Sequence, residues 1–327
     1  ERGVTLKTEA DGRMFPVTDS SQTIIDCLMK EANKYNVEIR MNKEVKQLAV
    51  GSGQLTGAKP FEIQFADDSI LYADFVCIAS GGYPKIMQYG WLKRSDHAVE
   101  EPVPSLFTFN MPGNSITALM GVVVENTQVK IVGTKLSESG PLLITHWGMS
   151  GPAVLKLSAW GARELAKADY GFSILVNWIP DFNENTLRDK MQQLRFELAA
   201  QKIINRNPFV LPNRLWEYLL VQSGVHPDLR WADLPAKEQN RLIKNLCAQE
   251  FAVKGKTTFK EEFVTAGGIE LNEIDFNTMQ SKKHTGLFFA GEIINVDGIT
   301  GGYNFQNAWT TGWIAAKAIA TFKSLIV

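Results

Sequence analysis

The chain has 327 residues, of which 45% are hydrophobic and 21% are charged, with 34 basic and 35 acidic side chains. This ordinary globular composition excludes a disordered or collagen-like chain, and about 150 residues per domain predicts two or three domains. The balanced charge indicates neither nucleic acid nor an anionic membrane surface as a partner, and no apolar run is long enough to span a membrane.

The first fifty residues alternate between helical and β patterns, as in an α/β unit. Asp19 is predicted to cap a helix whose apolar residues recur from Ile24 to Tyr35. Residues 37–41 then alternate as a strand that residues 45–48 continue.

Two further strand patterns follow. Residues 61–65 and 70–72 flank an Asp-Asp-Ser turn and predict a hairpin. The continuous apolar run 74–79 predicts a strand buried on both faces, as in a parallel sheet. The Gly-rich stretch 51–57 lacks the spacing of a phosphate-binding loop and is interpreted as a hairpin connection.

The pattern changes after residue 100. Short β-prone runs over residues 101–177 predict a small antiparallel barrel or sandwich, interrupted by one helix over residues 153–168. Apolar stripes separated by prolines predict several helices over residues 183–251. Residues 257–264 are β-prone again, so the helical segment is predicted to be inserted in the β domain. A buried strand at 286–291 and a closing helix at about 304–322 complete the chain.

Two Gly-rich loops that follow predicted strands form the strongest candidate site. One runs from Gly291 through Gly301-Gly302 into the closing helix, with four glycines and two carboxylates in 12 residues. Glycines allow close approach of backbone to a ligand, and free N–H groups at a helix start favour an electron-rich group. The second loop follows the 74–79 run, and the pair predicts one ligand crevice at the carboxyl ends of parallel strands. An ordinary strand-to-helix turn is the alternative.

A third loop, residues 145–152, precedes the helix that begins near Pro152. Ser150 is predicted to cap that helix rather than to act as a nucleophile. His146 is the best candidate for a general base, although a surface or structural role is the favoured interpretation of this histidine. The other histidines, His97, His226 and His284, have polar neighbours and are predicted to be exposed.

The cysteines and histidines give no sign of a metal centre. Cys27, Cys77 and Cys247 are scattered, and no cysteine or histidine pair has the spacing of metal ligands. An odd, sparse set of cysteines favours a reducing compartment, so a cytoplasmic location is expected.

Four segments together resemble the BaiN/YhiN-type flavoproteins, which include aminoacetone oxidase-like enzymes. These segments are Gly-Arg-Met-Phe-Pro at 12–16, Ile-Ala-Ser-Gly-Gly at 78–82, Thr-His-Trp-Gly-Met-Ser-Gly-Pro at 145–152, and the long run 291–308. The resemblance implies an α/β fold, with a Rossmann-like, two-dinucleotide-binding FAD domain, an inserted β-barrel and a small helical domain. It places the FAD domain at 1–100 and 266–327, the barrel at 101–182 and 252–265, and the helical insert at 183–251.

The resemblance also implies which residues meet the cofactor. The acidic residue after the last strand, Glu292 or Asp297, would meet the ribityl chain, and the helix start would face the pyrimidine edge of the flavin. Val45 would present its backbone to the adenine. The full expected cofactor set is Val45, Ala79, Ser80, Gly81, Gly82, Gly291, Glu292, Asp297, Gly298, Gly301, Gly302, Tyr303, Asn304 and Phe305, with His146 as the candidate catalytic residue.

Two departures from the family pattern qualify this expectation. Gly82 is followed by Tyr83-Pro84 without the glycine-rich stretch that the family usually carries. The strand–GxGxxG–helix that should clamp the pyrophosphate is also missing from this sequence. A chain truncated at its N-terminus is therefore expected, and these residues are expected to bind FAD weakly or not at all.

The function implied is an FAD-dependent oxidoreductase whose substrate is an unidentified small molecule, with NAD(P)H as a candidate reductant. The alternative is a non-catalytic flavin sensor or interaction module on the same scaffold. RNA binding by the barrel is a weaker alternative, because the charge is balanced. No nucleic acid or membrane partner is expected, and the sequence does not define the oligomeric state.

Overall fold

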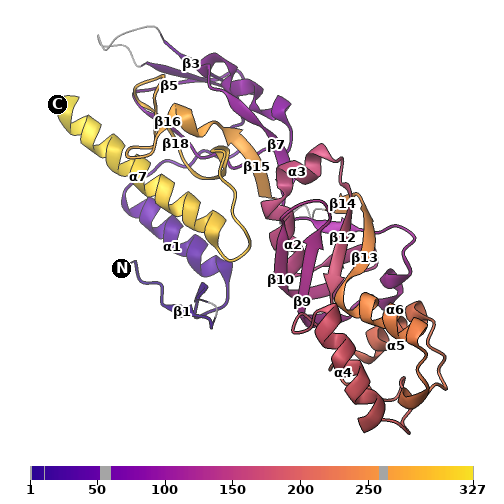
Figure 1. Cartoon of the computed structure of the whole chain (residues 1–327). Coiled ribbons are helices and arrows are strands. Elements are labelled where there is room, and N and C mark those ends of the chain that lie inside the picture. The colour runs from indigo at the N-terminus through magenta and orange to yellow at the C-terminus, as the bar shows by residue number, and fades with distance from the viewer. Residues whose placement is uncertain (1, 11, 52–59, 258–263, 327) are drawn as a thin grey trace.

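The computed structural model describes residues 2–10, 12–51, 60–257 and 264–326. Its elements form two main parts, joined by an antiparallel ribbon of β7 (Val99–Ser105) and β15 (Val264–Ile269) (Figure 1). Each part has its own cluster of buried apolar side chains. Most of the Gly-rich stretch 51–57 and of the β-prone run 257–264 lies outside the described residues. Across the described helices, none is both long and apolar enough to cross a membrane.

The first part contains a four-stranded sheet in the order β16-β17-β18-β6. The parallel sheet predicted from residues 74–79 is confirmed, because β6 pairs in parallel with β18, and Cys77 lies opposite Phe288. Burial on both faces is wrong for β6: Cys77 is exposed, whereas Phe288 opposite it is buried against Phe322 of α7. The elements are β6 (Val76–Ile78), η4 (Leu271–Glu273), β16 (Ile274–Asp275), β17 (Gln280–Ser281), β18 (Leu287–Phe289), η5 (Gly291–Ile293) and α7 (Tyr303–Ile326).

A three-stranded antiparallel sheet packs against the same buried cluster. It consists of β3 (Val45–Val50), β4 (Phe61–Phe65) and β5 (Ile70–Ala73), and η1 (Ile86–Ser95) lies against β3. The predicted hairpin is confirmed, since β4 pairs with β5 around a turn in which Asp68 has a positive φ of 61°. Leu48 and Phe61 are fully buried in the cluster.

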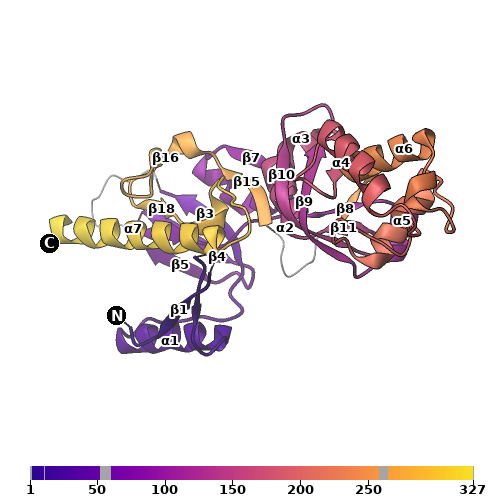
Figure 2. The same cartoon turned by 60° about the horizontal axis from the view of Figure 1, so that its bottom comes forward.

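The N-terminal segment comprises β1 (Leu6–Thr8), β2 (Met14–Pro16) and α1 (Ser21–Lys34), and Figure 2 shows α1 beside β1 and apart from the three- and four-stranded sheets. The predicted cap is wrong by one residue: the hydroxyl of Ser20 accepts from the N–H of Gln22 at 3.3 Å. Asp19 instead has a positive φ of 52°. The predicted strand at 37–41 does not form. Its apolar side chains are exposed, because no described strand lies beside it to share hydrogen bonds.

The second part is built on a seven-stranded sheet in which all neighbouring strands are antiparallel, as the β-prone runs predicted. The expected single helix at 153–168 is two helices that meet at Gly161. A Cβ at Gly161 would lie 2.9 Å from a Leu136 methyl carbon. The sheet order is β13 (Gln249–Lys254), β12 (Gly171–Asn177), β9 (Val123–Ile131), β10 (Ser137–Ile144), β11 (Gly148–Ser150), β8 (Thr108–Asn110) and β14 (Lys256–Thr257), with α2 (Pro152–Trp160), α3 (Ala162–Lys167) and η2 (Ser115–Leu119).

The helical segment lies at the far end of this part, away from α7 (Figures 1 and 2). Two of its helices begin directly after Pro212 and Pro235, as the sequence predicted, and the first begins after a side-chain cap that was not predicted. Asn183 and Thr186 form a reciprocal capping box at the start of α4. Leu187, Leu215 and Leu242 are fully buried in the same cluster as the sheet. The elements are α4 (Glu184–Glu197), α5 (Asn213–Ser223), η3 (Trp231–Asp233) and α6 (Ala236–Cys247).

Candidate functional site

The two Gly-rich loops leave the same edge of the parallel sheet. The N–H of Ala290, after β18, donates to the carbonyl of Ile78 at the end of β6 at 2.9 Å. Further along the two loops, Gly82 lies against Glu292, and a Cβ built on Gly82 would lie 3.1 Å from the Glu292 carboxyl carbon. The expected meeting of the loops at the carboxyl ends of β6 and β18 is therefore present in the structure.

Thr265 of β15 is the third residue at this meeting point, and the sequence reasoning missed it. Its N–H donates to Oε1 of Glu292 at 3.0 Å. Its hydroxyl Oγ1 is buried without a hydrogen-bond partner and would lie 3.0 Å from a Cβ on Gly82. A buried hydroxyl without a partner costs free energy, so such an atom at a site indicates a group that remains to be bound. The Thr-Ala-Gly-Gly sequence that starts here was the available signal.

Tyr89 of η1 closes the other side of the Gly82 loop. The N–H of Tyr83 donates to the Tyr89 hydroxyl at 3.4 Å, and the two rings meet edge to face at 5.0 Å. Burial raises the pKa of Tyr89, and the nearby charge of Glu292 raises it further. Tyr89 therefore keeps its proton at neutral pH and packs beneath the loop as a neutral phenol.

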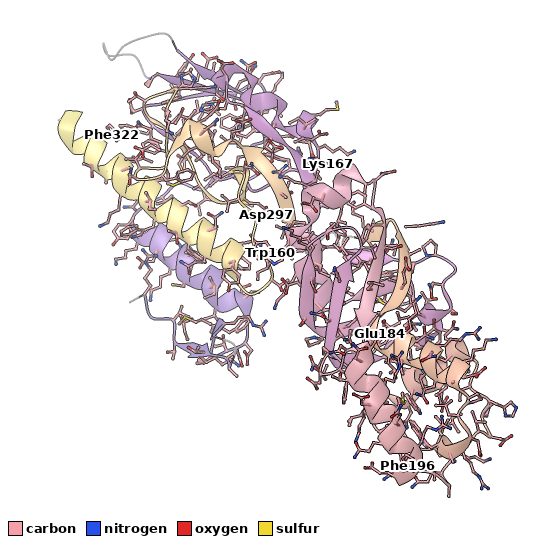
Figure 3. All side chains as sticks on the ribbon, viewed as in Figure 1. Trp160, Lys167, Glu184, Phe196, Asp297 and Phe322 are labelled. Atoms are coloured by element: carbon pink, nitrogen blue, oxygen red, sulfur yellow. The ribbon has the colours of Figure 1, made fainter. Side chains whose placement is uncertain are left out.

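The loop after β18 is held at several points. The N–H of Gly291 donates to the hydroxyl of Thr311 in α7 at 2.8 Å. Asp297, labelled in Figure 3 where the two parts of the molecule meet, accepts from the hydroxyl of Ser105 at 2.8 Å. The Asn304 side chain accepts from the N–H of Gly298 at 2.8 Å and donates to its carbonyl at 3.1 Å. Side chains of Asp297 and Asn304 thus shape the loop.

The start of α7 is open. Gly301 and Gly302 have positive φ values of 126° and 91°, and no atom lies within 4 Å of a Cβ built on Gly302. Tyr303 and Phe305 are 59% and 74% exposed. The free N–H groups of this first turn suit an electron-rich group, because the helix dipole places partial positive charge there.

The remaining expected site residues lie in different places. Ala79 and Ser80 are exposed beside Gly81 at the end of β6. Val45 begins β3 in the three-stranded sheet, and no backbone hydrogen bond described for it reaches either Gly-rich loop. His146 is exposed in the turn between β10 and β11, and its ring packs edge-on against Trp147 with centroids 3.9 Å apart.

The Thr145 to Pro152 loop is shaped by glycines that allow backbones to touch. A Cβ on Gly148 would lie 2.0 Å from the carbonyl oxygen of Phe109. The predicted cap at Ser150 is wrong, because Gly151, with a φ of 95°, holds the N-cap position of α2 and no side chain caps it. Ser150 pairs with Leu143 in the sheet instead.

The predicted exposure of His97 and His284 is also wrong. His97 Nε2 lies 2.7 Å from the Ser281 hydroxyl, and Nδ1 lies 3.0 Å from the Ser95 hydroxyl. His284 Nε2 lies 2.9 Å from the carbonyl oxygen of Ser95. Burial lowers the pKa of His97 to about 4. This cluster ties β17 to the end of η1. It could not be predicted from the sequence because Ser95 and His97 are far from Ser281 and His284 in the chain.

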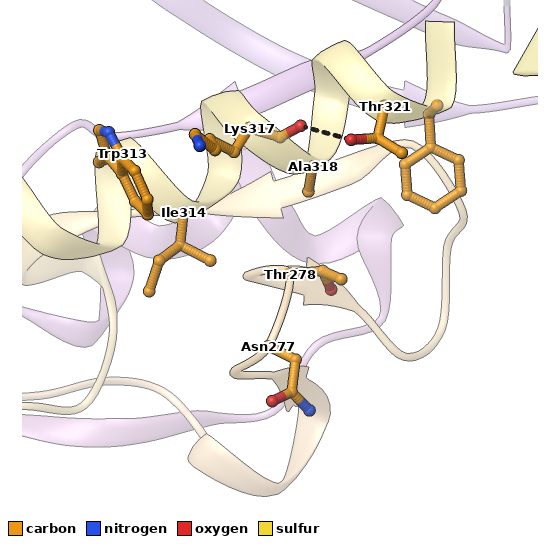
Figure 4. Close-up of a pocket in the computed structure, with 8 residues that line it drawn as sticks. Asn277, Thr278, Trp313, Ile314, Lys317, Ala318 and Thr321 are labelled. Carbon is orange, nitrogen blue, oxygen red and sulfur yellow. Dashed lines mark hydrogen bonds between the residues drawn. The ribbon is translucent and has the colours of Figure 1, made fainter. Parts of the chain in front are cut away.

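A cavity of about 450 Å³ lies at the other end of α7 (Figure 4). Trp313, Ile314 and Lys317 line one side of it, and Asn277 and Thr278 line the other. The Lys317 ammonium lies 4.6 Å from the centre of the Trp313 ring. No expected cofactor residue lines this cavity.

The Gly82–Glu292–Thr265 meeting point fits a flavin better than a metal ion. It has one carboxylate, a hydroxyl without a partner, and a glycine, Gly82, whose missing Cβ lets Glu292 and Thr265 pack close to the backbone. Glu292 and Thr265 can hold hydroxyl groups of a ribityl chain, and the open start of α7 can face the electron-rich ring. Among the residues that the structure describes, no three His, Cys, Asp or Glu side chains gather as metal ligands.

Comparison with known proteins gives concordant matches. The HI0933-like protein Rossmann domain family matches residues 1–318. Over 99% of the chain, the sequence is 30% identical to a ribosomal RNA dihydrouridine synthase of Escherichia coli, of which 78% is covered. A ribosomal RNA dihydrouridine synthase of Haemophilus influenzae is 28% identical over 98% of the chain and 78% of its own length. A 3-dehydro-bile acid delta(4,6)-reductase of Clostridium scindens is 25% identical over 94% of the chain and 76% of its own length.

Proposed function

The chain belongs to the HI0933-like protein Rossmann domain family, the family of the BaiN/YhiN-type flavoproteins, and from that premise we propose that it is a flavin-dependent reductase of carbon–carbon double bonds. The observation that carries the proposal is the meeting of Gly82, Glu292 and Thr265 at the carboxyl ends of two parallel strands. The names of the relatives support the reaction class: dihydrouridine is uridine with its ring double bond reduced, and a delta(4,6)-reductase also reduces double bonds.

We propose FAD as the flavin and NAD(P)H as its reductant. Glu292 and Thr265 would bind ribityl hydroxyls, and Gly82 would leave room for the Glu292 side chain to lie beside Thr265. The first turn of α7 would face the ring. When bound, the flavin supplies the hydride. The carbon that does not receive the hydride needs a proton, and we propose that a ring nitrogen of the exposed His146 delivers it.

The first substrate to test is uridine in ribosomal RNA, because two relatives that match nearly the whole chain are named for that product. This differs from the expectation, drawn from the balanced charge, of a small-molecule substrate and no nucleic acid. That expectation stays a prediction. A small unsaturated ketone is the second substrate class, supported by the name of the bile acid reductase.

We also propose the domain division expected from the sequence. The separate clusters of buried side chains support an FAD domain at 1–100 and 266–327 beside the remainder. A closed barrel at 101–182 and 252–265 is supported by a contact between β13, at one end of the sheet order, and β8, near the other end. Residues 183–251 would be the helical insert, although their apolar side chains share the core of the sheet.

The experiment supplies purified protein with FAD and NADPH or NADH, and offers either an unmodified ribosomal RNA transcript or a small enone. Mass spectrometry should find a product heavier by two hydrogens, at ~2 Da, in one arm. Glu292→Ala should lose flavin, whereas His146→Ala should keep flavin and slow turnover by about 10²-fold. Protein that binds FAD but reduces neither substrate would support the non-catalytic sensor instead. Because the sequence predicts weak FAD binding or none, FAD is supplied in excess; protein that binds none even then would agree with that expectation and contradict the proposed function of this chain.

A further inference from the structure

The Arg163 side chain, in the second part of the molecule, contacts the loop that follows β18 in the first part. It lies at the start of α3, whose Ala162 and Leu165 are buried in the second part. Its Nη1 donates to the Glu100 carboxylate on β7 at 2.8 Å, and its Nη2 donates to Oδ1 of Asn295 at 2.8 Å. One planar guanidinium thus joins α3, the connecting ribbon and the loop that leads to α7.

The backbone of that loop is fixed at its beginning by β15 and further along at Gly298 by the Asn304 side chain. The N–H of Asn295 donates to the carbonyl of Ile269 at 3.0 Å, where β15 passes, and Gly268 lies against Ile293. From Asn295 onward, the described side-chain anchors to other elements are the Arg163 contact, the bond from Ser105 to Asp297, and the two bonds between Gly298 and Asn304 of α7. The next residues are the glycines that open α7. One of these anchors, the Arg163 contact, is made from the second part, so the position of this segment depends in part on that contact.

We propose that Arg163 is a positioning residue for the flavin loop, and that it sets how residues 294–302 face the second part. This rests on the proposed function, because the ligand of the loop is the flavin. The Glu100 carboxylate neutralises the guanidinium and orients it by accepting from Nη1, so that Nη2 is available to donate to Asn295. A lysine has no such fork and cannot reproduce both contacts in the same geometry.

The first test needs no cofactor. Hydrogen–deuterium exchange of residues 294–302 should be about tenfold faster in Arg163→Gln than in the wild-type chain, while β9 exchanges unchanged. Lys167→Gln removes a cation from the same helix, one for which the described residues show no ion pair, and should leave exchange unaltered. Unchanged exchange in Arg163→Gln would overturn the proposal.

The second test separates positioning from stability. FAD affinity by fluorescence titration should fall about tenfold in Arg163→Gln and in Asn295→Leu, and remain near wild type in Asn295→Asp, which keeps an acceptor oxygen. The melting temperature without FAD should change little. A fall in melting temperature with unchanged affinity would show a merely structural role and overturn the proposal. If the wild-type chain itself binds no FAD, the proposed function fails, and the role of Arg163 in ordering the loop is decided by the exchange experiment alone.

Discussion

At the scale of single residues, Gly82 is a position in the candidate site where any larger side chain would crowd its neighbours. A methyl group there would meet Thr265 Oγ1 at 3.0 Å and the Glu292 side chain at 3.1 Å. We expect Gly82→Ala to weaken FAD binding about tenfold, because Glu292 must move to admit the Cβ. The matched control is Gly312→Ala in α7, where no atom lies within 4 Å of the added Cβ. That variant should bind FAD normally and gain about 0.5–1 kcal/mol of stability. Equal affinity in both variants would contradict the site.

Thr265 gives a second prediction at this scale. Its hydroxyl is buried without a partner, so Thr265→Val removes a polar group that costs free energy in the empty protein. We expect the variant to be as stable as the wild type or up to about 1 kcal/mol more stable without flavin, and to bind FAD more weakly. Denaturant titrations with and without FAD measure both effects. A variant that is less stable and binds FAD unchanged would show that the hydroxyl has a structural role.

His97 predicts how stability depends on pH. Its pKa in the folded protein is about 4, against about 6.5 for an unperturbed histidine. Between about pH 6.5 and 4, His97 is protonated in the unfolded chain and neutral in the folded protein. Stability therefore falls as the pH drops from about 6.5 to 4, and this loss is complete below pH 4. His97→Gln should flatten that part of a plot of melting temperature against pH. An unchanged slope would mean that other groups dominate.

At the scale of elements, the start of α4 tests a local rule. The Asn183 side chain accepts from the N–H groups of Asn185 and Thr186 at 2.9 and 3.0 Å, and the Thr186 hydroxyl accepts from the N–H of Asn183 at 3.0 Å. Asn183→Ala should destabilise the second part by about 1 kcal/mol. Asn185→Ala, at the neighbouring exposed position, should cost much less. Similar losses in the two variants would refute the importance of the cap.

Elements that depend on neighbouring residues were predictable, and those that depend on distant ones were not. The hairpin at 61–73 and the helices of 183–251 follow from turn residues, prolines and apolar stripes close in sequence. The strand at 37–41 failed because a strand needs a partner that periodicity does not supply. Of the site, the two Gly-rich loops were found as local motifs. Thr265, Tyr89 and Arg163 were missed because folding brings them to the loops from elsewhere in the chain.

At the scale of the whole molecule, the arrangement separates two cores. One contains Leu287 and Phe288 of the parallel strand and lies beside the candidate site, and the other contains Leu157 and Leu215 and lies beyond the β7–β15 ribbon. Figure 1 shows the ribbon crossing between them. Because cooperative unfolding units coincide with separate cores, each part should unfold as its own unit.

The last prediction follows from this separation and concerns calorimetry. We expect two thermal transitions, of which Leu215→Ala lowers one and Leu287→Ala lowers the other, each by about 2–5 kcal/mol because both side chains are fully buried. FAD at 100 times its Kd should raise only the transition that Leu287→Ala lowers, by about 2.7 kcal/mol, since its contacts lie mainly in that part. Arg163 and Ser105 link the loop to the second part and the ribbon, so Arg163→Gln should weaken the remaining coupling. A single transition that both alanine variants shift equally would show one cooperative unit.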